Sequence, residues 1–519
     1  MSGTRVAVTL LVLVSDVLGC GSARPQPAPL LDPTALAEVV GDGESNGSDE
    51  VSTFESADGG LGDRSDGGPT EPEVVMLDPR PLFAAACELA TVEPDPAACL
   101  AAAALLALAP DLTPEERARV ELAAARANAW NQVDARAVGV LLPPSGDYAR
   151  LGKRALAALE LAFDGATGVR LVVRDTGGDP VRAAAAAEAL VMEEHVAVVL
   201  GPIGRKETAA ALEVLRRFRV PVLPLASAMP AAALAPGLDD VAFKTRASPE
   251  ELTEALAKHA RSELGAARLA ILGPDTDVGL ELANGMAAAF ARLGGTVVRV
   301  VAYDTHTKDF HPIVKQLAGL PASLKKPTKT TPKVDFDALF IPEQALVVRR
   351  LAPFLEFWRI APRTRPGGPG VQYLGGSGWN QVSIVDHAER LTENAVFADV
   401  VDPAWADPAA ADFARRFLAR TQLKPSAVEA EVFDAASLLR DALTGLAGAD
   451  HAVRKLLRAR LGFARMRPGV TGFMVVVGGR VLPRVTLSTV MGDVLRRRLS
   501  ESEERSLRSP PRAPNAGRP

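Results

Sequence analysis

Short apolar runs alternate with longer amphipathic segments from Arg136 onward, and this alternation constrains the fold more than any other feature of the sequence. Runs such as AVGVLL, VAVVLG, RLAILGP and FDALFIP are typical of strands that are buried on both faces. The segments between them, such as YARLGKRALAALELAF, have the apolar spacing of helices. Together they predict an α/β fold with mostly parallel sheets covered by helices on both faces. Because roughly 350 residues exceed one comfortable core, we expect two lobes over residues 136–490.

Composition and motifs exclude several functions. The 519-residue chain is 48% hydrophobic and has a net charge of −5, so it can bury large cores and shows no basic excess for a nucleic-acid partner. GGSGW lacks the last glycine of a nucleophile elbow because Trp379 stands there. GPIGRKET lacks the G-K-[ST] ending of a phosphate-binding loop. We therefore predict a protein that is not an enzyme and has no catalytic residue, cofactor or metal site.

The N-terminus carries a targeting signal. Arg5 precedes the run VAVTLLVLV, which is too short for a stable membrane anchor and ends at VLGC, with Cys20 as its last residue. Residues 1–20 resemble a bacterial lipoprotein signal, which implies that Cys20 carries lipid; an ordinary secretory signal with an incidental cysteine is the alternative. Gly21 after the cysteine implies a periplasmic, lipid-anchored protein at the outer rather than the inner membrane. Residues 21–78 are rich in Gly, Ser, Asp, Glu and Pro and are predicted to form a disordered tether.

The two remaining cysteines lie in a predicted helical lead-in over residues 80–132. Cys87 and Cys99 lie on Ala/Leu-rich segments separated by the helix-breaking sequence TVEPDP. In an exported chain this pair predicts a disulfide that joins a helical hairpin, with two free thiols as an equally open alternative. A metal site at these cysteines has no nearby histidine to support it. At the other end, residues 491–519 are charged and proline-rich, and we predict a disordered tail.

A series of motifs in the two-lobed region resembles one family. GVLLPPSGDYARLGKRALAALELAF, VVRDTGGDP, VVLGPIGRKETAAALEVLRRFRVPVLPLASA and FKTRASPEELTEALAKHA follow one another in the order found in type I periplasmic binding proteins, the leucine/isoleucine/valine-binding protein family. The resemblance covers roughly residues 136–485. It implies two Rossmann-like lobes that are joined by three crossings and close on a ligand by hinge motion.

The same resemblance implies ligand contacts in the loops that follow the strands. The residues at these positions are Ser145, Tyr148, Gly204, Arg205, Lys206, Ser227, Ser377 and Trp379. GPIGRKET opens a helix, so its N–H groups with Arg205 and Lys206 favour an anionic group; the alternative is that both cations face solvent.

Several residues depart from the pattern of amino-acid receptors. Amino-acid receptors of this family resemble one another in having a hydroxyl side chain at the position of Gly204. They have an acidic residue at the position of Pro249, which here has Glu250 beside it. Val278 replaces an aromatic residue and Ser377 an acidic one. Since a buried ammonium needs a paired carboxylate, we expect no ordinary α-amino acid as the ligand.

Two functions fit these features. The cysteine anchor, tether, helical lead-in and LGGSGWN loop resemble lipoproteins of the penicillin-binding-protein activator type. That resemblance implies a regulatory contact with a penicillin-binding protein or another envelope synthase. The alternative is a receptor that serves an ABC permease and binds a small polar or anionic ligand through Arg205, Lys206 and Ser227.

Overall fold

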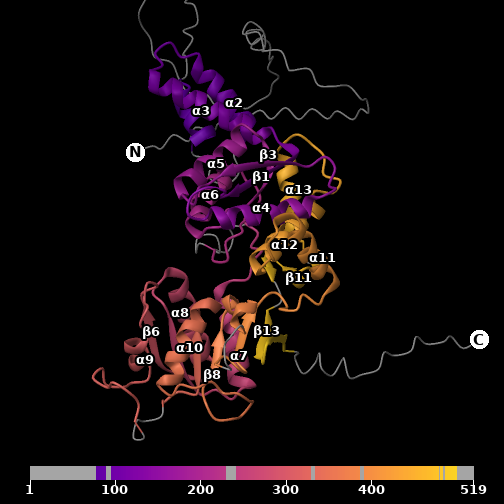
Figure 1. Ribbon diagram of the computed structural model, residues 1–519. Helices are drawn as coiled ribbons and strands as arrows, with labels where there is room; N and C mark the ends of the chain where they lie inside the picture. The colour runs from indigo at the N-terminus through magenta and orange to yellow at the C-terminus, as the bar shows by residue number, and fades with distance from the viewer. Residues whose placement is uncertain are drawn as a thin grey trace, which may run out of the picture. The chain divides into compact units, whose positions relative to one another are not determined.

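The computed structural model describes residues 78–88, 95–229, 241–328, 334–385, 391–463, 465–477, 480–482 and 485–498 (Figure 1). The chain divides into two units, residues 1–76 and 77–519, and all described residues belong to the second. The predicted signal with Cys20, nearly all of the predicted tether and most of the predicted tail lie outside them. None of the helices in the described residues has the length and apolarity needed to cross a bilayer.

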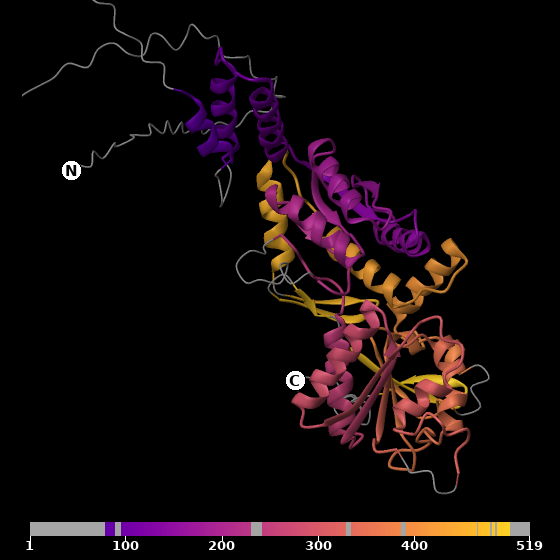
Figure 2. The same ribbon diagram turned by 90° about the vertical axis from the view of Figure 1, so that its left-hand side faces the viewer.

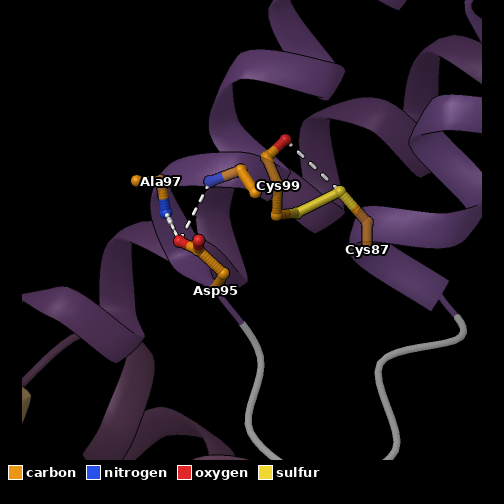
Figure 3. The surroundings of a disulfide bond; sticks show 5 residues. Cys87, Asp95, Ala97 and Cys99 are labelled. Carbon is orange, nitrogen blue, oxygen red and sulfur yellow. Dashed lines mark hydrogen bonds between the residues drawn. A yellow bond between two sulfur atoms is a disulfide. The ribbon is translucent and has the colours of Figure 1, made fainter. Parts of the chain in front are cut away.

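The described part begins with a small helical unit. It consists of α1 (Arg80–Phe83), the π-helical turn η2 (Ala84–Glu88), α2 (Pro96–Ala107) and α3 (Pro114–Asn131). Helix α3 starts at a capping box, in which Thr113 and Glu116 each accept the other's backbone N–H. A disulfide joins Cys87 to Cys99 with their Cα atoms 4.9 Å apart, next to the α2 cap at Asp95 (Figure 3). The bridge therefore ties η2 to the first turn of α2.

We expect the double substitution Cys87→Ser/Cys99→Ser to destabilise this helical unit by about 2 to 4 kcal/mol, since the bridge restricts the unfolded chain. Hydrogen exchange of the α2 amides should rise accordingly. Thiol alkylation checks the bridge directly: oxidised, denatured protein should leave both cysteines unlabelled until a reductant is added. Full labelling of both cysteines without reductant would rule the bridge out.

Lobe 1 contains a four-stranded parallel sheet of order β2-β1-β3-β4. Its strands are β1 (Asp134–Leu142), β2 (Arg170–Asp175), β3 (Val196–Leu200) and β4 (Val222–Leu223). On one face pack α5 (Pro180–Met192) and α6 (Arg205–Arg217), and on the other pack α4 (Ala149–Phe163), α11 (Pro408–Thr421) and α12 (Ala427–Leu443). Helix α13 (His451–Gly462) contacts β3. Successive residues of β1 point into the two opposite cores, as a strand buried on both faces requires.

Lobe 2 contains a seven-stranded sheet of order β14-β13-β9-β8-β7-β5-β6, with helices on both sides (Figure 2). The strands are β5 (Arg268–Pro274), β6 (Thr296–Tyr303), β7 (Ala338–Ile341), β8 (Gln372–Gly375), β9 (Val396–Asp399), β13 (Thr486–Met491) and β14 (Val494–Arg497). Helices α7 (Pro249–Ser262) and α8 (Asp277–Arg292) cover one face, and α9 (His311–Leu317) and α10 (Ala345–Phe357) cover the other. Two short 3-10 turns, η4 (Ser377–Trp379) and η5 (Val382–Ile384), follow β8.

The chain passes between the lobes more than once. It leaves lobe 1 after Phe243 and enters lobe 2 at α7, then returns directly after β9, where Val400 already belongs to the core of lobe 1. A three-stranded antiparallel sheet follows α13, formed by β10 (Arg465–Gly469), β11 (Gly472–Val477) and β12 (Arg480–Leu482). The chain then re-enters lobe 2 as β13. The predicted two-lobed α/β fold is confirmed.

One predicted boundary is wrong. The disordered tail was expected from residue 491, whereas β14 lies within that stretch and pairs antiparallel with β13. Leu495 of β14 packs against the core of lobe 2. The segment reads as a charged tail because this edge strand contains Arg496 and Arg497 and leaves Val494 exposed.

Candidate functional site

A cavity of about 1080 Å³ has walls from both lobes. Lobe 1 contributes the start of α4, part of α11 and the segment that leads into α12, and lobe 2 contributes residues 380–382 and Leu495. Apolar or aromatic side chains on its wall include Tyr148, Leu151, Val382, Trp405 and Leu418. The cavity therefore lies where a ligand would contact both lobes at once.

Cationic side chains outnumber acidic ones around this cavity. Four cations line it, namely Arg150, Arg154, Arg415 and Lys424, against the two carboxylates of Asp147 and Glu429. Arg415 also pairs with Asp412 on its own helix, and Glu429 is engaged by Arg154. The electrostatic balance of the wall therefore favours an anionic ligand.

Arg154 is the most firmly held of these cations. Its Nε donates to the buried carboxylate of Glu429 at 2.5 Å, and its Nη2 donates to the carbonyl of Lys424 at 2.9 Å. Its guanidinium also lies over the ring of Phe417 at 5.6 Å. Burial opposes ionisation of Glu429, but hydrogen bonds from Arg154 and Ser426 outweigh it, so the pKa of Glu429 lies below its ordinary value. The Glu429 carboxyl is therefore ionised at neutral pH.

A buried polar cluster joins the first two crossings between the lobes. Arg246, on the first crossing, donates from Nε to Glu431 of α12 at 2.7 Å and from Nη1 to the carbonyl of Leu225 at 2.8 Å. The second oxygen of Glu431 accepts the backbone N–H of Ala247 at 2.9 Å. Glu431 thereby fixes the first crossing to a helix of lobe 1.

The second crossing starts at Asp399, whose carboxylate accepts Asn380 Nδ2 and the N–H of Val400, each at 2.7 Å. Burial raises the pKa of Asp399 to about 7, against the effect of these two hydrogen bonds. Glu431 adds to the rise and Arg246 opposes it. The buried carboxylates of Asp399 and Glu431 thus both interact with the guanidinium of Arg246. Asn380 donates to Asp399 and also lines the cavity, so it links this cluster to the cavity wall.

The loop after β3, which was expected to bind an anion, already contains a carboxylate. Glu207 in the first turn of α6 is buried and accepts a hydrogen bond from Thr176 at 2.5 Å. One of its oxygens lies where a Cβ on Gly204 would stand, so only glycine fits at that position. The positive end of the α6 dipole is therefore compensated by the protein's own side chain. Neither Gly204 nor Glu207 is part of the cavity wall described above.

Arg205 and Lys206 are both exposed at the start of α6. Arg205 forms an ion pair with Glu281 of α8, 3.5 Å away on the other lobe. Partial burial raises the pKa of Glu281, with Glu250 and Asp277 adding to the rise and Arg205 opposing it. Because exposed pairs contribute little free energy, this contact between the lobes is a weak one that salt would screen further.

The other predicted ligand contacts have varied places. Tyr148 lines the cavity, whereas Ser145 donates to Asp175 at 2.5 Å. Ser227 is half-buried in the loop after β4, and Ser377 is exposed at the start of η4. Trp379 was expected at the ligand, but it is fully buried in the core of lobe 2 and donates from Nε1 to the carbonyl of Ile341 at 3.0 Å. Its large apolar ring is better satisfied in that core than in a polar loop.

Sequence reasoning missed Arg154, Glu429, Arg246, Glu431 and Asp399. The only available signal was their spacing: Arg150 and Arg154 share one face of a helix, and Glu429 stands three residues after Ser426, as in a capping box. Among the described residues, no group of three or more His, Cys, Asp or Glu side chains is placed to hold a metal ion.

Comparisons with known proteins agree with this geometry. Residues 137–323 match the family described as periplasmic binding protein. No curated protein matches the chain. Solved structures with a similar fold include an ABC transporter substrate-binding protein from Sphaerobacter thermophilus, with 19% identity over 70% of this chain and 96% of that one and a TM-score of 0.59.

Two further structures define the class. The leucine-binding protein LivK from Thermotoga maritima has 19% identity and a TM-score of 0.52 over 70% of this chain and 97% of its own. A solute-binding protein from R. palustris, solved in complex with benzoate, has 17% identity and a TM-score of 0.53 over 70% of this chain and 95% of its own. The two-lobed part of the chain therefore has the type I periplasmic-binding-protein fold.

Proposed function

We propose that this protein is an extracytoplasmic receptor that binds a small organic acid between its two lobes. The observation that carries the proposal is the cavity whose wall combines α4 and α11 of lobe 1 with residues 380–382 of lobe 2. A ligand in contact with both walls stabilises the closed arrangement, which is how two-lobed proteins couple binding to hinge motion.

The charges of the cavity support an acid without an ammonium group. Glu429 is engaged by Arg154, and Asp147 lies exposed at the start of α4 among four cations. A zwitterion would leave its ammonium without a dedicated buried partner. Of the proteins with a similar fold, some were solved with isoleucine or leucine and others with 4-hydroxybenzoate, 3,4-dihydroxybenzoic acid or benzoate. The second group of ligands suits this charge balance.

In this proposal the protein delivers its ligand to an ABC permease. Lipid on Cys20 would hold it at a membrane facing the periplasm, with the outer membrane as the predicted one, and residues 21–78 would act as the tether. The predicted role as a penicillin-binding-protein activator rests on the anchor, tether and lead-in, and it stays a prediction.

A thermal-shift screen with organic acids tests the proposal, with leucine and isoleucine as comparison ligands. An acid at 100 times its Kd should stabilise the folded protein by about 2.7 kcal/mol. The same acid should reduce the radius of gyration in small-angle X-ray scattering, as the lobes close. If no acid has either effect and the full chain instead captures a cell-wall synthase, the receptor proposal is wrong and the activator prediction gains support.

A further inference from the structure

We propose that Arg154 binds the carboxylate of the ligand, and that this ligand is an aromatic acid whose ring packs against Tyr148 and Trp405. The inference rests on the proposed function and names the chemistry of the same cavity. It follows from the way Arg154 is held, from the cations beside it and from the two aromatic side chains on the wall.

Arg154 presents one free edge of its guanidinium. Glu429 takes Nε and the Lys424 carbonyl takes one hydrogen of Nη2, while Nη1 makes no hydrogen bond to any of the described residues. The side chain is 17% exposed and lines the cavity. Nη1 and the second hydrogen of Nη2 form the fork that matches two carboxylate oxygens. Because Glu429, Lys424 and the Phe417 ring already fix the guanidinium, little conformational entropy is lost on binding.

Two further cations strengthen the preference for an anion. Arg150 precedes Arg154 by four residues on α4, so both side chains lie on one face of the helix. Lys424 lines the same cavity from the segment before α12. Both are exposed, so they attract the carboxylate from solution, and Arg154 alone offers the rigid fork.

The aromatic walls are positioned by the backbone. The ring of Tyr148 lies against Gly178, where a Cβ would come within 2.8 Å of Cδ2, and Gly178 also has a φ of 78° that favours glycine. Trp405 ends a turn, in which its N–H donates to the carbonyl of Asp402. The centroid of its ring lies 6.1 Å from that of Phe413. An aromatic ring gains area and quadrupole contacts against such side chains, whereas an aliphatic acid gains area alone.

Calorimetric titration of the full chain with benzoate tests the inference, with benzamide as the neutral ligand of the same shape. We expect binding of benzoate and none of benzamide. Arg154→Lys keeps the charge and loses the fork, and it should weaken benzoate about 10- to 100-fold. Arg150→Gln should weaken it less, with a smaller salt dependence. The matched control is Arg420→Gln. Arg420 of α11 pairs with Glu160 of α4 but does not line the cavity. Its replacement should therefore leave the affinity for benzoate unchanged.

Folding of the variants is checked separately. Since Arg154→Lys could leave the Glu429 carboxylate poorly paired, the double variant Arg154→Gln/Glu429→Gln removes both charges and should fold while losing benzoate. Equal benzoate affinity in this variant and the wild type would overturn the inference. So would tighter binding of phenyl phosphate than of benzoate. If succinate closes the lobes and benzoate does not, the inference of an aromatic ligand is wrong. The proposed receptor function would stand in that case.

Discussion

Replacing Arg246 by alanine is expected to lower the free energy of unfolding by about 3 to 5 kcal/mol, because it leaves the buried Glu431 carboxylate without its cation. Arg246 is 11% exposed and Glu431 5% exposed at their side chains, so water cannot take over this role. The carbonyl of Leu225 also loses its donor. Urea unfolding at pH 8 measures the effect.

Two companion variants separate this cause from loss of packing. Arg292→Ala breaks an exposed pair with Glu254 that has a similar N···O distance of 2.8 Å, and it should cost less than about 1 kcal/mol. Arg246→Met/Glu431→Gln removes both charges and keeps an oxygen for the N–H of Ala247. It should recover more than half of the loss. A loss as large as that of Arg246→Ala would show that the unpaired charge on Glu431 is not its cause.

Replacing Asp399 by asparagine is expected to change how stability depends on pH. The pKa of Asp399 is about 7 in the folded protein, chiefly because of burial, against an ordinary value of 3.8. The folded protein therefore keeps a proton that the unfolded chain releases between about pH 4 and 7. The contribution of this group is fully present below about pH 4 and is lost as the pH rises through 7. The asparagine side chain in the variant has no such proton to lose.

The measurement is the difference in unfolding free energy between Asp399→Asn and the wild type at pH 5 and at pH 8. That difference should shift by about 3 kcal/mol in favour of the variant at pH 8. Taking a difference matters because burial lowers the pKa of His259, and the effect of that histidine on stability is common to both proteins. A difference that is the same at both pH values would mean that Asp399 keeps its charge throughout.

The sequence predicts most strands of the two large sheets. Each strand from β1 to β8 lies in an apolar run of the sequence, so it is recognisable without knowing its neighbours, even in β2 and β6, which are only partly buried. Strands β9 and β14 are not predicted: β14 carries Arg496 and Arg497 and becomes a strand only through its pairing with β13. A clear apolar run therefore identifies a strand even at a sheet edge, as in β2 and β6, whereas the charged strand β14 depends on its partner.

The candidate site is less predictable for a similar reason. Arg154 and Glu429 are 275 residues apart in the chain, and each alone reads as an ordinary charged residue on a helix. Arg246 and Glu431 are separated by 185 residues. The anion site predicted at GPIGRKET stays a prediction, but the sequence does contain the residue that competes with it: Glu207 stands three residues after Gly204, and its carboxylate lies where a Cβ on Gly204 would stand.

The placement of α13 has a consequence for the order in which the protein can fold. Arg454 of α13 is fully buried and donates hydrogen bonds to the carbonyls of Val196 and Phe218. Val196 begins β3 and precedes Arg454 by 258 residues. Lobe 1 therefore cannot be completed while the chain is still being synthesised through lobe 2, because its last helix has not yet emerged. Until then the apolar strands of lobe 1 lack the helix that covers them and stay accessible to chaperones.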